Sequence, residues 1–123
     1  MAEGADSWIV GRSFRIVAID GVGVLEAPTA DITFGVDGHV TGRATVNRFF
    51  GPYALDGATL TLGPLAGTLM AGPPEAMEQE QRLHRALVRT LTVVPGDGGR
   101  RVELRDGDDV VLVLVATDTG EWM

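Results

Sequence analysis

The chain has 123 residues, a formal net charge of −7 and 45% hydrophobic residues, which is typical of one globular domain rather than a disordered segment. The negative charge argues against nucleic acid and anionic lipid as partners, because both are themselves anionic. No cysteine is present, so the sequence offers no disulfide framework and no thiol chemistry.

The N-terminal residues 1–8 lack the basic and apolar regions of a signal peptide. The longest apolar run, residues 110–116, is too short to cross a bilayer as a helix. We therefore expect a cytoplasmic protein without a membrane span, or an exported one whose signal has been removed. We expect a lead-in at 1–10, one domain at 11–116 and a tail at 117–123.

Short strands separated by Asp-Gly turns account for most of the chain. An early strand is expected at 14–19. Five Asp-Gly pairs follow, and this dipeptide between apolar runs is the strongest short-range hairpin signal, because both residues tolerate positive φ in a type I′ turn. The pairs lie at 20–21, 37–38, 56–57, 97–98 and 106–107.

The clearest hairpin covers residues 30–46, where apolar and polar residues alternate on both arms. A second hairpin is expected at 53–62. Further strands are expected at 65–71, 91–94, 101–105 and 109–116. The last strand is apolar on both faces, so it needs cover on both.

One helix is predicted, at about residues 74–90, because Pro73 and Pro74 suit a first helical turn. Acidic residues come early in this segment and arginines late, which matches the helix macrodipole. Apolar residues at helical spacing form one stripe, which is Ala76, Leu83, Leu87 and Leu91, widened by Met77 and Val88. The predicted class is α+β, with a curled antiparallel β-sheet or partial barrel of about 7–9 short strands packed against this helix.

The most distinctive stretch is residues 47–53, which reads Asn-Arg-Phe-Phe-Gly-Pro-Tyr and is followed by Thr68 and Met70. Further positions of the same pattern are Phe34, Val40, Gly42, Leu55, Leu60, Glu80, Leu83 and Leu87. This order of residues resembles the META domain, the family of the heat-shock protein HslJ, over about residues 11–115. The resemblance implies a compact α+β domain linked to stress tolerance, secretion or the cell envelope, with no established enzymatic activity.

The chain departs from the family pattern at two cysteine positions, which are occupied here by Val46 and Gly72. Both cysteines are absent together, as expected if a disulfide has been lost or if this version of the domain is never exported.

Six residues form the candidate structural or contact cluster: Asn47, Arg48, Phe49, Tyr53, Thr68 and Glu80. We expect residues 47–53 to form a turn, because Asn47 tolerates left-handed φ, Gly51 permits a bend and Pro52 stiffens it. In the alternative interpretation, Arg48 and Tyr53 form a small recognition surface.

Glu80 lies beside the apolar stripe of the predicted helix, so it needs hydrogen-bond partners if it is buried. Possible partners are backbone N–H groups of residues 47–51, Thr68, Arg48 or Tyr53. We favour a structural clamp between the helix and the turn.

No catalytic residue, cofactor or metal is predicted. Glu80 and His84 are one helical turn apart and could begin a metal site, but His39 is the only other histidine and no third ligand is evident. The two serines, Ser7 and Ser13, are not part of a nucleophile elbow.

Three functions are compatible with the sequence. The first is a non-catalytic domain that contacts a protein partner, through the region of Arg48 and Tyr53 or through the last strand. The second is a binder of a small apolar ligand in a cavity of the curled sheet. The third, a hydrolase or metal-dependent enzyme, requires Glu80, His84 and His39 to converge and is not favoured.

Overall fold

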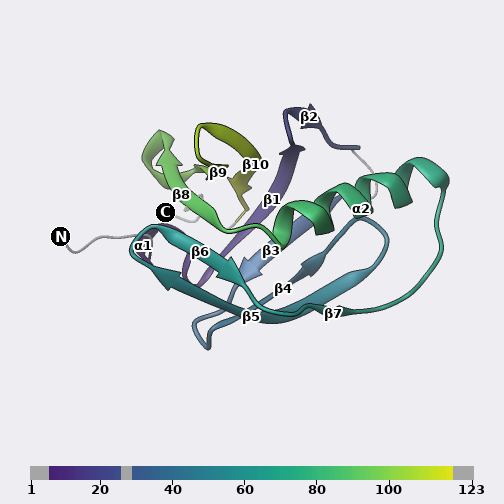
Figure 1. The fold of residues 1–123 in the computed structure, drawn as a ribbon, viewed down its shortest axis with the longest axis horizontal. Coiled ribbons are helices and arrows are strands. Elements are labelled where there is room, and N and C mark those ends of the chain that lie inside the picture. Colours follow the sequence, from purple (N-terminus) through teal and green to yellow (C-terminus); the bar gives the residue numbers. More distant parts are fainter. Residues whose placement is uncertain (1–5, 26–28, 118–123) are drawn as a thin grey trace.

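The computed structural model describes residues 6–25 and 29–117 (Figure 1). The elements in chain order are α1 (Asp6–Ile9), β1 (Arg12–Ile19), β2 (Val22–Gly23), β3 (Ala30–Phe34), β4 (His39–Arg43), β5 (Arg48–Asp56), β6 (Thr59–Leu62), β7 (Ala66–Gly67), α2 (Pro74–Leu87), β8 (Leu91–Gly96), β9 (Arg101–Asp106) and β10 (Asp109–Ala116). A single 3-10 turn, Asp97–Gly99, connects β8 to β9.

The strands form an antiparallel barrel. The order β10-β9-β8-β6-β5-β4-β3-β1 is closed by a further pairing of β10 with β1, so eight strands encircle the core. Two very short strands lie outside the ring, with β2 paired to β1 and β7 paired to β5. The α+β class is confirmed, and the curled sheet closes completely.

All five Asp-Gly pairs connect consecutive antiparallel strands, as predicted. Two positive φ angles in succession, as a type I′ turn requires, occur at Asp20–Gly21, whereas at Asp97–Gly98 they are followed by a third at Gly99 within the 3-10 turn. At Gly57 and Gly107 the preceding aspartate ends a strand and only the glycine has positive φ, +63° in each case. A positive φ at the first central position alone is the pattern of a type II′ turn.

The inside of the barrel is filled by side chains. Phe34 is central to this packing, because its ring meets Phe14 and Tyr53 edge-on at centroid distances of 6.1 and 5.4 Å. Large side chains buried almost completely include Phe14, Ile16, Ile32, Phe34, Phe49, Leu60, Leu91 and Leu104. An eight-stranded barrel is just wide enough for such a filling.

Helix α2 contributes Leu83, Ala86 and Leu87 to this core. The helix was predicted to reach about residue 90 but ends at Leu87, so Val88 is 74% exposed and does not widen the apolar stripe. Leu91, assigned to the stripe from its spacing, is buried as the first residue of β8 instead. In Figure 1, α2 lies to the upper right and α1 to the far left.

Segment 1–10, predicted only as a lead-in, contains the short helix α1. Ile9 at its end is fully buried in the barrel core, and Trp8 packs against that core.

Two strand predictions require correction. Residues 65–71 form only the short β7, because the segment after it is tied to Asn47 by side-chain rather than ladder hydrogen bonds. The expected turn at 47–53 is largely strand, since β5 begins at Arg48. Pro52 fits there because β5 changes its partner at that point, pairing with β7 through Phe50 and with β6 from Tyr53 onward.

The last strand, β10, lies between β9 and β1. Residues 111–114 are buried on both faces of the strand. This agrees with the prediction that a strand with apolar residues on both faces is covered on both. This strand therefore presents no exposed apolar face to a partner.

Candidate functional site

Glu80 of α2 is at the centre of a buried polar network. Its Oε1 atom accepts hydrogen bonds from the backbone N–H groups of Val46 and Asn47, both at 2.9 Å, and its Oε2 accepts from Asn47 Nδ2 at 2.7 Å. Glu80 is 6% exposed and Asn47 is 4% exposed. The carboxylate thus connects the helix to the segment between β4 and β5, as a structural clamp would.

The pKa of Glu80 lies below its ordinary value of 4.5. Burial acts to raise that pKa, because it removes water from the charged form. The hydrogen bonds from the side chain and backbone of Asn47 and the backbone of Val46, with the charge of His84, together outweigh burial and lower it. Glu80 therefore acts as an ionised acceptor, and its oxygens are engaged by three donors.

Asn47 extends the network to the segment after β7. Its Oδ1 accepts hydrogen bonds from Thr68 Oγ1 at 2.9 Å and from the backbone N–H of Met70 at 2.6 Å. Its Nδ2 also donates to the carbonyl oxygen of Met70 at 3.0 Å, and Thr68 Oγ1 accepts from the backbone N–H of Arg48. One buried amide therefore fixes a chain segment that has almost no strand pairing of its own.

A second contact from α2 was missed by the sequence analysis. Gln79 is 1% exposed, donates from Nε2 to Thr45 Oγ1 at 2.9 Å and accepts from the backbone N–H of Leu25 at 2.8 Å. Thr45, not Asn47, has the positive φ in this connection, at 122°, which is strained for a β-branched residue. The spacing of Gln79 between Ala76 and Leu83 on the apolar stripe was the available signal.

Arg48, Phe49 and Tyr53 lie on β5 but do not form one surface. Arg48 is exposed, whereas Phe49 on the opposite face is 2% exposed and its ring meets the His84 ring edge-on at 6.3 Å. Tyr53 shares the inner face with Phe49, and its hydroxyl donates to the carbonyl oxygen of Gly35 at 2.6 Å. Because side chains alternate along a strand, Arg48 and Tyr53 point to opposite sides of the barrel wall.

The residues at the two family cysteine positions are spatial neighbours. A Cβ atom placed on Gly72 would lie 3.6 Å from Val46 Cβ and 2.7 Å from its Cγ2. The valine side chain therefore occupies the space that a side chain at position 72 would need. This pair lies beside the Glu80 network, because the backbone N–H of Val46 is one of its donors.

Three large apolar side chains are exposed on β5 and on the segment that Asn47 holds. Phe50, Leu69 and Met70 are 55%, 98% and 59% exposed. Phe50 is on the outer face of β5, opposite Ala66 of β7, and Leu69 and Met70 directly follow Thr68. We call these three residues, together with Arg48, the contact surface. The alternating pattern of β5 could have identified Phe50, but only the fold brings Leu69 and Met70 to the same region.

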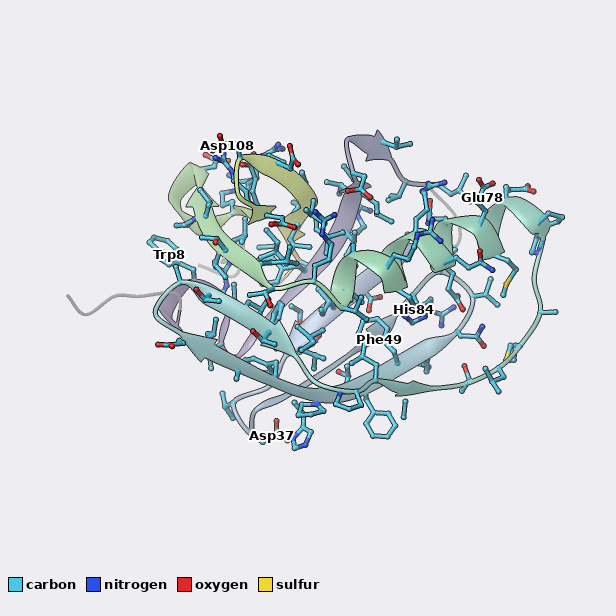
Figure 2. The ribbon with its side chains drawn as sticks, in the orientation of Figure 1. Trp8, Asp37, Phe49, Glu78, His84 and Asp108 are labelled. Atoms are coloured by element: carbon cyan, nitrogen blue, oxygen red, sulfur yellow. The ribbon has the colours of Figure 1, made fainter. Side chains whose placement is uncertain are left out.

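The two histidines lie on separate elements. His84 is on α2, near the Phe49 label in Figure 2, whereas His39 begins β4 with its Nδ1 atom 3.7 Å from Asp37 Oδ2. Among residues 6–25 and 29–117, no three His, Cys, Asp or Glu side chains are grouped so that they could hold a metal ion. No helix in the described part of the chain has the length and apolar character needed to cross a membrane.

Comparison with known proteins identifies the domain. An NMR structure of a protein from Burkholderia xenovorans matches with a TM-score of 0.73 and 22% identity, covering 94% of this chain and 88% of that chain. A second NMR structure matches with a TM-score of 0.71 and 22% identity, covering 91% of this chain and 94% of that one. A search of the curated proteins finds no match. At this identity the two structures establish the fold, while the META domain family model matches residues 7–119, so the chain belongs to the META domain family.

Proposed function

We propose that this META domain is a non-catalytic module that binds a protein partner through the contact surface, in a stress-response or cell-envelope process. The observation that supports the proposal is the exposure of Phe50 on β5 and of Leu69 and Met70 on the segment whose backbone Asn47 holds next to the start of β5. Grouped exposed apolar side chains are typical of protein interfaces, whereas single ones are common on any surface. The process is the one that the resemblance to the family implies.

The contact surface is held in place before a partner arrives. Asn47 binds the backbone of Met70 from both sides, as donor and acceptor, and is itself bound by Glu80. Thr68 adds a backbone hydrogen bond from its N–H to the carbonyl oxygen of Arg48. Ordering a loop opposes binding, so a segment that is already fixed loses less conformational entropy when it forms an interface.

The buried polar groups fit this role better than a catalytic one. Glu80 is tied to three donors, and the neighbouring Gln79 amide is engaged at both ends. A general acid or base would need a reacting atom within hydrogen-bond reach. We therefore assign Glu80 to the support of the contact surface through Asn47, and Gln79 to the attachment of α2 to Thr45 and Leu25.

The alternative of a small apolar ligand inside the barrel is less well supported. Three phenylalanine rings occupy the interior: Phe14 and Phe34 are 0% exposed and Phe49 is 2% exposed. A ligand would have to displace these rings, and close-packed interiors resist such a change. We give this alternative second place.

Photo-crosslinking in cells of the source organism tests the proposed function. Benzoylphenylalanine is placed at Phe50 or Leu69, and in two controls at Val36 or Val88. The control positions are 83% and 74% exposed and lie in the turn between β3 and β4 and at the C-terminal end of α2. We expect the same protein to be crosslinked from positions 50 and 69 and not from 36 or 88. Equal crosslinking from all four positions, or none from 50 and 69, contradicts the proposal.

A further inference from the structure

We propose that the partner presents an acidic, extended peptide segment, which lies across a row of arginines next to Phe50. This inference rests on the proposed function and specifies the chemistry of its partner. The row consists of Arg15, Arg43 and Arg48, on three different strands of the barrel.

The pairing of the strands places these residues side by side. Arg15 of β1 is opposite Asp31 of β3, Asp31 is opposite Arg43 of β4, and Arg43 is opposite Arg48 of β5. Residues that are directly opposite in neighbouring strands share a face. The face is the outer one, because the sequence neighbours of these residues, such as Phe14, Ile32 and Phe49, are buried in the core.

The three guanidinium groups have no partner within the part of the chain that the structure describes. Four other arginines differ, since Arg82, Arg89, Arg101 and Arg105 each lie within 4.0 Å of a carboxylate. Arg85 and Arg100 are also exposed without a carboxylate at that distance in the described residues, but they do not lie beside another arginine in the strand pairing. The carboxylate of Asp31 accepts a hydrogen bond from the backbone N–H of Arg43 at 3.1 Å, not from its side chain.

The position of these arginines is unfavourable for the isolated domain. Arg43 directly faces Arg48, and like charges in opposite positions of an antiparallel pair are destabilising. The row contains three arginines and one aspartate, which lies between Arg15 and Arg43, although the whole chain carries a formal charge of −7. A ligand with several negative charges would relieve this repulsion and complement the face.

The dimensions fit a short extended peptide. Neighbouring strands are about 4.8 Å apart, so the row from β1 to β5 is about 14 Å long, the length of four or five extended residues. Phe50 lies two residues from Arg48 on the same face of β5, within reach of an apolar side chain at the end of that peptide. Near Arg15 and Asp31 the surface has a hollow of about 340 Å³, lined also by Ser13, Thr29 and Thr33, which gives room for a side chain at the other end.

A carboxylate-rich peptide is favoured over a nucleic acid. A long phosphate backbone would be repelled by the net charge of −7, and Asp31 interrupts the row that such a backbone would follow. A peptide can place uncharged residues opposite Asp31 and carboxylates opposite the arginines. Carboxylates also match the fork of the guanidinium group.

The test is an NMR titration of the isotope-labelled protein with the peptide acetyl-Glu-Ser-Glu-Ser-Glu-Phe-amide at low salt. The control peptide has Gln in place of each Glu. We expect shifts of the Nε–H signals of Arg15, Arg43 and Arg48 and of the Phe50 amide with the acidic peptide only. We also expect the affinity to fall about tenfold between 20 and 300 mM NaCl, because exposed charges are screened.

Two variants with the same change in charge locate the site. Arg43→Gln combined with Arg48→Gln should weaken binding of the acidic peptide about tenfold. Arg85→Gln combined with Arg100→Gln, at exposed arginines outside the row, should change it less than about twofold. The dispersion of the NMR spectrum confirms that both variants remain folded, so weakened binding cannot be attributed to unfolding.

Several results would overturn the inference. One is that the Gln peptide binds as tightly as the acidic peptide, and another is that the two double variants lose binding equally. A third is that an oligothymidylate binds the same face more tightly than the acidic peptide does. A fourth is that the signals of this face shift with protein concentration when no peptide is present, which would show that a second copy of this chain occupies it. Photo-crosslinking from positions 50 and 69 that is unchanged by Arg43→Gln and Arg48→Gln would also overturn it while leaving the proposed function standing. Absence of crosslinks from positions 50 and 69 contradicts the proposed function, whatever the peptide titration shows.

Discussion

The Glu80 carboxylate binds Asn47 through both of its oxygens, with Oε1 accepting from the backbone N–H at 2.9 Å and Oε2 accepting from the side-chain amide at 2.7 Å. The two residues come from α2 and from the connection between β4 and β5. Because Asn47 also holds Thr68 and Met70, this pair determines where the chain runs after β7. Disruption of the pair should therefore affect both stability and the contact surface.

Glu80→Gln is expected to lower the free energy of unfolding by about 2–3 kcal/mol at pH 7. The glutamine amide would supply a donor where Asn47 Nδ2 already donates, so one buried polar contact becomes unfavourable. The measurement is urea unfolding of the variant and the parent protein. Glu78→Gln on the exposed side of the same helix is the control, and its cost should stay below about 0.5 kcal/mol. If Glu80→Gln and Glu78→Gln lower the free energy of unfolding equally, Glu80 is not a structural clamp.

The stability difference between the parent and Glu80→Gln should depend on pH. The folded-state pKa of Glu80 is lower than 4.5, so the folded protein binds fewer protons here than the unfolded chain does. The stabilisation is fully present above about pH 4.5 and is lost as the pH falls through the lower folded-state value. Unfolding curves at pH 7, 5, 4 and 3 should show the difference narrowing only below about pH 4.5. A difference that stays constant down to pH 3 would count against an ionised Glu80.

The double variant Val46→Cys and Gly72→Cys should form a disulfide on mild oxidation. The Cβ separation of 3.6 Å lies within the range of natural disulfides, and Gly72 does not have a positive φ that would oppose a side chain. Closing a loop of a few dozen residues is expected to stabilise the protein by about 3 kcal/mol. Thiol titration and thermal unfolding, with and without dithiothreitol, provide the measurement.

The single variant Gly72→Ala is the matched control for this disulfide. Its new Cβ would lie 2.7 Å from Val46 Cγ2, so we expect it to destabilise the protein. Free thiols that persist in the oxidised double variant would show that positions 46 and 72 do not approach each other in solution.

Arg48→Gln should leave stability unchanged or raise it by about 0.2–1 kcal/mol, because it removes the like charge opposite Arg43. Thermal unfolding at low and high salt measures this effect, and the gain should shrink as salt screens the repulsion. Arg105→Gln, which removes an ion pair with Glu103, is the comparison and should not be stabilising. A clear loss of stability in Arg48→Gln would mean that its guanidinium group is paired.

Much of the architecture could be predicted from local patterns, because strand alternation and turn preference depend on neighbours in the sequence. The five Asp-Gly turns, the hairpin that contains Phe34 and Val40 and the buried last strand are examples. The ends of elements were less predictable. Val88 continues the helical spacing of the apolar stripe but is exposed, because the chain leaves the helix at Leu87 to enter β8.

The candidate site could be predicted only in part. A carboxylate beside an apolar stripe indicates that Glu80 needs partners, and the structure supplies Asn47 and Val46. The grouping of Arg48 with Tyr53 did not hold, because β5 starts before these residues and alternation separates their faces. No local pattern links Gln79 to Thr45, which are brought together when α2 packs on the barrel.

The sequence by itself determined the class of fold, the kind of each major element and the need of Glu80 for partners, because these depend on propensity, periodicity and the cost of burying a charge. Only the tertiary structure decided that the sheet closes through β1 and β10, that Val46 faces Gly72 and that Arg15, Arg43 and Arg48 share one row. These relationships depend on strand register between segments distant in the chain, and register is set by the packing of the whole core.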